Sequence, residues 1–153
     1  MDHYVAGKIV SFVDLLKIAR EAQAAGKNVV QSHGVFDIIH PGSIKHLSEA
    51  RKLGDLLVVT VIRDQDVRRG PGRPVFTDKM RAVNVASLAQ VDFVAVVADE
   101  IPFDSVRSLK PDIFAKGQAY QERDRQIHEK IFKEERELHF NKTAIRETEG
   151  FSF

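Results

Sequence analysis

The sequence predicts an α/β domain with a doubly wound parallel sheet and helices on both of its faces. Short apolar runs alternate along the chain with segments of helical periodicity, and this alternation implies parallel strands joined by right-handed crossovers. Two of the runs, Leu56–Ile62 and Phe93–Val97, are apolar almost without interruption, which is typical of strands buried on both faces. A length of 153 residues fits one such domain. We therefore expect a Rossmann-like sheet.

The expected helices have apolar residues at a spacing of three to four positions and recognisable ends. Ser11 is placed to cap the first helix, Gly26 to end it, and Pro102 to occupy the first turn of a later one. The expected helices cover residues 11–25, 44–53, 77–88, 102–109 and 123–137. The expected strands cover residues 28–32, 56–62, 93–97, 112–115 and 138–140. The many charges of the last helical segment indicate a solvated face.

Composition limits the classes of function. The formal net charge is +1, which provides no general attraction to nucleic acid or to membranes. The chain contains no cysteine, so disulfides, thiolate metal sites and cysteine nucleophiles are excluded. No apolar run approaches the roughly 18 residues of a membrane-spanning helix, and residues 1–20 lack the layout of a signal peptide. We expect a cytoplasmic protein in which any basic site is local.

The most informative stretch is residues 34–43, which read Gly-Val-Phe-Asp-Ile-Ile-His-Pro-Gly-Ser. It follows the first expected strand and precedes a helix. The amino end of a helix presents free N–H groups and a partial positive charge. Gly34 and Gly42 allow close approach of the backbone, and His40 can donate to phosphate oxygens. The stretch therefore predicts a site for polyphosphate.

Two further polar segments are expected at the same edge of the sheet. An arginine-rich loop, residues 63–75, follows the second strand, and Lys116-Gly117 follows the fourth. In open α/β sheets ligands bind beyond the carboxyl ends of the strands, where the strand order reverses. We expect one cleft, lined by residues 34–43, Asp64, Arg73 and Lys116.

Residues 34–43 resemble the signature G-x-F-D-x-x-H-x-G-H of the nucleotidyltransferase (cytidylyltransferase-like) superfamily. Gly34, Phe36, Asp37, His40 and Gly42 match it, and Ser43 stands in place of the second histidine. The resemblance covers nearly the whole chain and is closest to the heptose-1-phosphate adenylyltransferase domain, the ADP-heptose synthase. Further similar residues are Gly72-Arg73-Pro74-Val75, Arg81, Val91-Asp92, Lys110-Pro111-Asp112, Lys116-Gly117, Tyr120 and the phosphate-holding motif Thr148-Glu149-Gly150-Phe151-Ser152, whereas His33 and Ala119 depart from that group.

The resemblance implies a nucleotidyltransferase of carbohydrate metabolism. It would transfer a nucleoside monophosphate, preferably AMP, from a nucleoside triphosphate to a sugar phosphate and release pyrophosphate. The implied cofactor is Mg²⁺, which bridges phosphates and uses few protein ligands, so no metal-ligating residues are assigned. The implied catalytic residues are His40, Lys116 and Ser43, and the implied substrate contacts are Asp64, Arg69 and Arg73. The implied nucleotide contacts are Gly34, Val35, Phe36, Asp37, His40, Gly42, Lys116, Gly117 and Ser152.

Two classes of function stay open. One is the enzyme, acting on ATP or on CTP, in the latter case as a cytidylyltransferase. The other is a nucleotide-binding module with little or no catalysis, because the Ser43 hydroxyl cannot carry the positive charge of a histidine. For Asp37 we favour a structural role, in which its side chain holds the loop through hydrogen bonds to the backbone.

The expected partners follow from the same resemblance. They are ATP or CTP, a sugar phosphate, a second copy of the chain in a homodimer, and a sugar kinase that is fused or separate. Neither nucleic acid nor a membrane is expected. The chain is interpreted as a single domain, residues 1–153, that stops inside the phosphate-holding motif and lacks the C-terminal helix.

Overall fold

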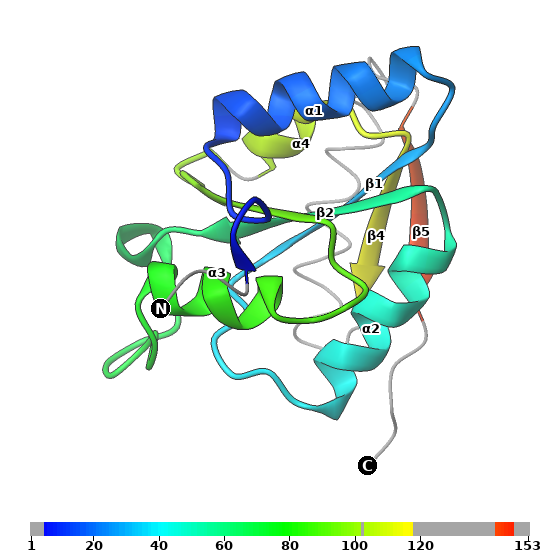
Figure 1. Cartoon of the computed structure of the whole chain (residues 1–153). Coiled ribbons are helices and arrows are strands. Elements are labelled where there is room, and N and C mark those ends of the chain that lie inside the picture. Colours follow the sequence, from blue (N-terminus) through cyan, green and yellow to red (C-terminus); the bar gives the residue numbers. More distant parts are fainter. Residues whose placement is uncertain (1–4, 102, 118–142, 149–153) are drawn as a thin grey trace.

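The computed structural model describes residues 5–101, 103–117 and 143–148. They form a five-stranded sheet in the order β3-β2-β1-β4-β5, with every strand pair parallel (Figure 1). The strands are β1 (Val29–Gly34), β2 (Leu56–Ile62), β3 (Phe93–Val97), β4 (Ile113–Gly117) and β5 (Ala144–Thr148). The helices are α1 (Phe12–Ala24), α2 (Pro41–Lys52), α3 (Asp78–Ala86) and α4 (Asp104–Leu109), with a short 3-10 helix, η2 (Asp64–Asp66). The predicted α/β, Rossmann-like class is confirmed.

Helices cover both faces of the sheet, α1 and α4 on one and α2 and α3 on the other (Figure 1). Val58 and Val59 of β2 belong to different cores, because successive side chains of a strand point to opposite faces. The core beneath α1 and α4 consists of Leu15, Ala19, Val29, Val58, Ala95, Val97 and Leu109. The core beneath α2 and α3 includes Val30, Leu47, Ala50, Val59, Val61, Val85, Ala86 and Val94.

The strand order reverses at the centre of the sheet. The chain runs outward from β1 through β2 to β3, and then returns by way of α4 to the other side of β1, where β4 lies. β1 pairs with β2 along the whole of Val29–Gly34, but its pairs with β4 are Val30 with Ile113 and Gln31 with Phe114. The carboxyl ends of β1 and β4 therefore flank the topological switch point, where ligands of such sheets bind.

Side chains cap the amino ends of three helices. Ser11 accepts the Asp14 N–H at 3.1 Å in α1, and Thr77 accepts the Met80 N–H at 3.3 Å in α3. α2 begins at Pro41, three residues before the predicted start at residue 44. A proline lacks an N–H and suits the first turn, and His40 supplies the cap.

The last strand differs from the prediction. β5 is Ala144–Thr148, whereas the sequence favoured a strand at 138–140; that segment and the charged segment 123–137 lie outside the described residues. β5 pairs with β4 at the edge of the sheet and exposes Arg146 and Glu147. An edge strand is held by backbone pairing and often carries charged side chains, so it has no continuous apolar run to recognise.

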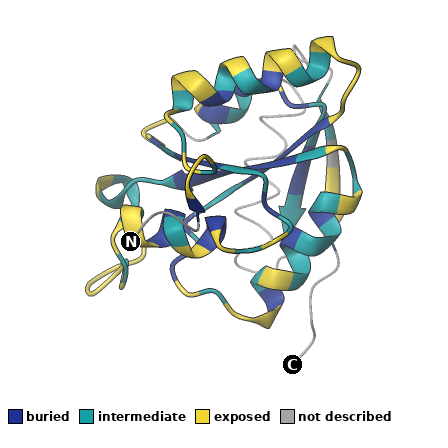
Figure 2. Cartoon of the chain, in the orientation of Figure 1, coloured by how far each residue is buried: buried dark blue, intermediate teal, exposed yellow. Residues whose placement is uncertain are grey.

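Burial follows this layering (Figure 2). The five central residues of β2 are buried, and the outward sides of the helices are exposed. Within the part of the chain that the structure describes, no helix is both long and apolar enough to cross a membrane.

Candidate functional site

The signature loop, residues 34–43, starts with a backbone path that depends on glycine. Phe36 has a φ of +50°, in the left-handed region, and its ring lies back over Gly34. A Cβ at position 34 would lie 3.2 Å from the Phe36 Cε2 atom, which is tighter than most Cβ contacts in proteins. The absence of a side chain at Gly34 therefore allows the Phe36 ring to pack against the core beneath α2 and α3.

His40 is the N-cap of α2. Its Nδ1 atom accepts a hydrogen bond from the Gly42 N–H at 3.1 Å, and the residue is exposed. An accepting Nδ1 carries no proton, so the neutral imidazole has its proton on Nε2, which is a donor. Together with the N–H groups of the first turn, which contains Ser43, this Nε2 atom makes the amino end of α2 a set of donors at the positive end of the helix dipole.

Asp37 joins the signature loop to the end of the arginine loop, residues 63–75, and to Phe76 directly after it. Its buried carboxylate accepts the Val75 N–H at 2.8 Å and the Phe76 N–H at 3.0 Å, and Arg73 donates to it at 3.4 Å. Burial raises the pKa of Asp37, but the two backbone N–H groups and the Arg73 guanidinium outweigh it and hold the pKa below its usual value. Asp37 therefore has the structural contacts that the sequence favoured.

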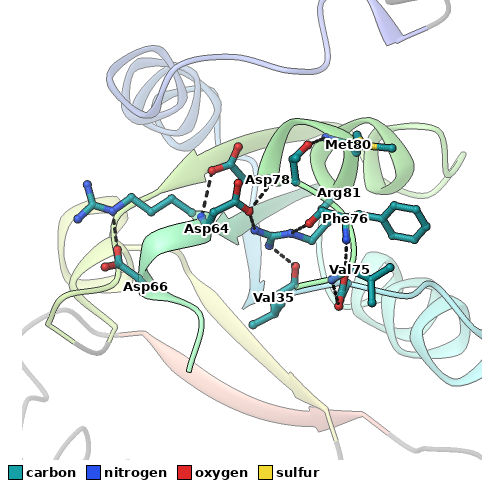
Figure 3. A network of polar contacts seen from close by, with 11 residues as sticks. Val35, Asp64, Asp66, Val75, Phe76, Asp78, Met80 and Arg81 are labelled. Carbon is teal, nitrogen blue, oxygen red and sulfur yellow. Dashed lines mark hydrogen bonds and ion pairs between the residues drawn. The ribbon is translucent and has the colours of Figure 1, made fainter. Parts of the chain in front are cut away.

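Arg81 of α3 is bonded to the same two loops (Figure 3). Its side chain is fully buried on α3. Its Nε donates to the Phe76 carbonyl at 3.0 Å, and its terminal nitrogens donate to the Val35 carbonyl at 2.7 Å and to Asp64 at 2.9 Å. One planar guanidinium thus fixes three chain segments at once, which the single ammonium of a lysine could not do.

Asp64, which the sequence assigned to the substrate, is engaged within the chain. Its Oδ1 accepts both Arg81 and the Asp78 N–H, the latter at 2.8 Å, and its own N–H donates to the Asp78 carboxylate at 3.0 Å (Figure 3). These bonds close the amino end of α3 against the end of β2. The Asp64 side chain is 41% exposed, so it still reaches solvent.

The predicted basic residues of the arginine loop differ in their placement. Arg73 lies against Asp37 of the signature loop, with its side chain 46% exposed. Arg69 is exposed, and no hydrogen bond or ion pair among the described residues joins it to the signature loop. The structure therefore brings Arg73 to the signature loop and leaves Arg69 at the surface of the arginine loop.

β4 carries Lys116 and Gly117 to the other side of the switch point. β4 is the neighbour of β1, and the two parallel strands end at the same edge of the sheet. Lys116 and His40 thus come from adjacent strand ends. Ser152, the last predicted nucleotide contact, lies outside the described residues.

His46 was not among the predicted site residues, yet the structure gives it contacts with two strands. Its Nε2 lies 2.7 Å from the Ser32 hydroxyl and its Nδ1 lies 2.6 Å from the Thr148 hydroxyl. Burial lowers the pKa of His46 to about 4. The signal was helical spacing, because positions 42, 46 and 50 share one face of a helix and both Gly42 and Ala50 are buried.

His33, which departs from the heptose group, is also held inside the fold. Its Nδ1 lies 2.8 Å from the Thr60 hydroxyl, and its Nε2 lies 3.0 Å from the Asp99 carboxylate. The His33 side chain is 5% exposed, and the Phe103 ring lies beside it with ring centroids 5.8 Å apart. These contacts tie the carboxyl end of β1 to β2 and to the loop after β3.

Comparison with known proteins identifies the family to which this chain is similar. The family model described as cytidylyltransferase-like matches residues 32–148. The chain is 40% identical over 112 residues to the bifunctional protein HldE of Syntrophotalea carbinolica, and 41% identical over 115 residues to that of Campylobacter fetus. These alignments cover 72% and 74% of this chain but 22% and 24% of the relatives, so the chain spans about a quarter of their length.

Solved structures agree with the fold. A lipopolysaccharide core biosynthesis protein from Thermoplasma volcanium is 31% identical, with a TM-score of 0.64 over 83% of this chain and 100% of that one. Pantoate–β-alanine ligase from Francisella tularensis, solved with β,γ-ATP and β-alanine, gives a TM-score of 0.66 over 94% of this chain and 67% of that one. At 13% identity the ligase shows a shared fold only.

The matched region contains nearly all of the features built up above. It extends from Ser32 in β1 to Thr148 in β5, and it includes the signature loop, Arg81 and Lys116. The family resemblance found in residues 34–43 is confirmed. The chain therefore belongs to the cytidylyltransferase-like family of nucleotidyltransferases.

Proposed function

We propose that this domain transfers the AMP moiety of ATP to a sugar phosphate and releases pyrophosphate. The observation that supports this most directly is the amino end of α2, which stands at the carboxyl end of the central strand with His40 as its cap. Because Nδ1 of His40 is used within the cap, its Nε2–H is the donor available for a phosphate oxygen. The family match and the likeness to HldE support the same reaction class.

In this reaction a phosphate oxygen of the sugar phosphate attacks the α-phosphorus of ATP. The bond from the α-phosphorus to the oxygen that bridges to the β-phosphate breaks, and pyrophosphate leaves with that oxygen. Two anions must be brought together, so positioning and the stabilisation of negative charge provide the rate enhancement, and no covalent intermediate with the protein is required.

The residues of the chain divide this work. His40 and the first-turn N–H groups of α2, beside Ser43, are proposed to hold the triphosphate, and Lys116 of β4 is proposed to neutralise charge near the α-phosphate. Asp37 and Arg81 keep the two loops in place, as their contacts indicate. The backbone at Gly34, Val35, Phe36, Gly42 and Gly117 and the side chain of Ser152 are proposed to contact the nucleotide, and Arg73, Arg69 and Asp64 the sugar phosphate.

Magnesium fits this site only as a companion of the nucleotide. Among the described residues, no three His, Asp or Glu side chains gather to bind a metal ion, and Asp37 and Asp64 already accept N–H donors. Mg²⁺ commonly keeps several waters and binds to substrate phosphates. We propose that it enters with ATP and neutralises phosphate charge, and no residue of this chain is assigned to it.

The second activity of the HldE relatives bears on the partner. Those proteins are bifunctional, and this chain matches about a quarter of their length. We infer that the domain works beside a sugar kinase, fused or separate, because a kinase would supply the phosphorylated acceptor that adenylyl transfer consumes. We also propose that the domain forms a homodimer and is located in the cytoplasm.

Two measurements test the function. Isothermal titration with ATP and with CTP, each with Mg²⁺, measures which nucleotide binds. Pyrophosphate release with ATP and a set of hexose and heptose 1-phosphates measures transfer. We expect ATP to bind and at least one sugar phosphate to give turnover. Turnover with CTP but not with ATP would identify the activity as that of a cytidylyltransferase instead of an adenylyltransferase. The absence of binding to either nucleotide would contradict the proposal.

A nucleotide-binding module with little catalysis is the second candidate, and Ser43 is the observation that favours it. Ser43 lies in the first turn of α2, where the family signature has a histidine. A serine hydroxyl donates one hydrogen bond but carries no charge, and losing one donor to a developing oxyanion typically costs about 10²–10³ in rate.

The variant Ser43→His decides between the two candidates. We expect it to raise the rate of pyrophosphate release while changing the dissociation constant of ATP less, because the added charge acts mainly on the transition state. Ser48→His, farther along the same helix, is the control for a histidine added elsewhere on α2. If the parent released pyrophosphate rapidly and the Ser43→His variant released it more slowly, Ser43 would instead be adapted to this substrate.

A further inference from the structure

A chain of hydrogen bonds crosses four elements on the α2 face of the sheet. It starts at the Ser32 hydroxyl of β1, passes through both ring nitrogens of His46 on α2, and reaches the Thr148 hydroxyl of β5. The Thr148 hydroxyl also donates to the Lys116 carbonyl of β4 at 3.3 Å. Ser32 and Thr148 are 1% and 4% exposed, so water does not readily replace these contacts.

The donor and acceptor properties of these groups fix the direction of donation along this series of hydrogen bonds. A carbonyl oxygen only accepts, so the single hydroxyl proton of Thr148 points to Lys116. Thr148 must then accept from His46, which places the imidazole proton on Nδ1. Nε2 is left as an acceptor for the Ser32 hydroxyl proton. The lowered pKa of His46, which results from burial, agrees with a neutral ring.

These hydrogen bonds lie where the backbone pairing between β1 and β4 has ended. The pairing of β1 with β4 ends at Gln31 and Phe114, one residue before Ser32. β5 pairs with β4 as far as Gly117 and Thr148, and it has β4 as its neighbour in the sheet. His46 therefore connects β5 and the end of β4 to the central strand β1, beyond the last backbone pair of β1 with β4.

The His46 ring also lies against the end of β4. A Cβ built on Gly117 would be 3.7 Å from His46 Nδ1. The imidazole is thus linked to the Lys116 carbonyl through Thr148 and lies near Gly117, while its own helix begins with the His40 cap and has Ser43 in its first turn. One side chain connects the two sides of the switch point.

We propose that His46 is a positioning residue for the nucleotide site, which as the Nδ1–H tautomer holds Thr148 and the Lys116-Gly117 end of β4 in place relative to the amino end of α2. This rests on the proposed function only for the statement that the positioned groups bind a nucleotide. The tautomer and the anchoring of β5 stand on the contacts alone.

Two substitutions separate the ring nitrogens. The side-chain amide nitrogen of asparagine can occupy the place of imidazole Nδ1, and that of glutamine the place of Nε2. His46→Asn therefore keeps the donor to Thr148 and loses the link to Ser32, whereas His46→Gln keeps the link to Ser32 and loses the donor to Thr148. Thr148→Val removes the same donor–acceptor link from the other side with little change in shape, and Thr148→Ser keeps the hydroxyl.

The test measures two quantities in the full chain: the hydrogen exchange of the β5 amides, and the dissociation constant of ATP with Mg²⁺ by isothermal titration. We expect His46→Gln and Thr148→Val to speed exchange in β5 and to weaken ATP binding about tenfold, the effect of one lost hydrogen bond. His46→Asn and Thr148→Ser should stay close to the parent in both. A purely structural histidine would make the two His46 variants alike, and that result would overturn the proposal.

Nitrogen-15 spectra of the imidazole provide a readout that needs no nucleotide. We expect a protonated Nδ1 and an unprotonated Nε2 for His46 at neutral pH, and the opposite tautomer would overturn the proposal. If the parent bound neither ATP nor CTP, the proposed function would fail. The spectra and the exchange of β5 would still decide whether His46 anchors the strand.

Discussion

The two ring nitrogens of His40 have separate tasks, and this separation makes the residue testable. Nδ1 caps α2 through Gly42, and Nε2 of this exposed residue is the proposed phosphate donor. Replacing the ring by a methyl group removes both tasks at once. Replacing it by asparagine removes only the second, because asparagine is among the best N-cap residues.

We therefore predict different outcomes for His40→Ala and His40→Asn. Both variants should bind ATP about 10- to 100-fold more weakly, since a hydrogen bond to a charged group contributes about 1.5–3 kcal/mol. Only His40→Ala should also lose stability, by about 1 kcal/mol, because it alone lacks the cap. Isothermal titration measures the first effect and urea unfolding the second. An asparagine variant that binds ATP as the parent does would remove His40 from the phosphate site.

At the scale of the element, the signature loop is fixed by one buried arginine. The Val35 and Phe76 carbonyls both accept from Arg81, and Asp37 holds the adjoining N–H groups of Val75 and Phe76. The loop that follows β1 is thus bonded to the start of α3 by both its backbone and its side chain. A binding loop held in this way loses little conformational freedom when a ligand arrives, so less of the binding energy is spent on ordering it.

Arg81→Met should show how much the fold depends on this junction. The variant keeps much of the volume but leaves the buried Val35 carbonyl and the half-buried Phe76 carbonyl without their donor, so we predict a loss of about 3 kcal/mol in the free energy of unfolding. Lys79→Met, at an exposed position on the same helix, should change it by less than about 0.5 kcal/mol. Urea unfolding of both variants measures the difference. Equal stabilities would mean that Arg81 does not fix the loops.

The elements that sequence reasoning located well are those whose pattern is local. Leu56–Ile62 and Phe93–Val97 are observed with the predicted bounds, because a strand buried on both faces is an apolar run with polar ends. β5 was missed because its place is decided by pairing with β4, which no local pattern records. Sequence reasoning did not identify the contacts of His46 and Arg81 for a similar reason, since their partners include Thr148 and Val35, which lie far away in the sequence.

At the scale of the whole molecule, the hydrogen bonds of His46 and Thr148 connect three strands to one helix, and burial keeps the His46 ring neutral. The pKa of His46 falls from 6.5 to about 4 on folding because the ring is buried. Between these two values the unfolded chain binds a proton that the folded chain does not. The free energy of unfolding therefore falls as the pH drops from about 6.5 toward 4, and the contribution of His46 is complete above 6.5.

This difference in pKa predicts a pH dependence that belongs to one residue. A shift of that size corresponds to about 3 kcal/mol between pH 7 and pH 4. Urea unfolding of the parent and of His46→Asn across this range isolates it, because asparagine does not titrate and keeps the donor to Thr148. The parent should lose about 3 kcal/mol more than the variant as the pH falls. Parallel curves of unfolding free energy against pH would show that His46 takes up its proton equally in the folded and unfolded chains. The proposal that the folded chain holds a neutral, anchored ring would then be wrong.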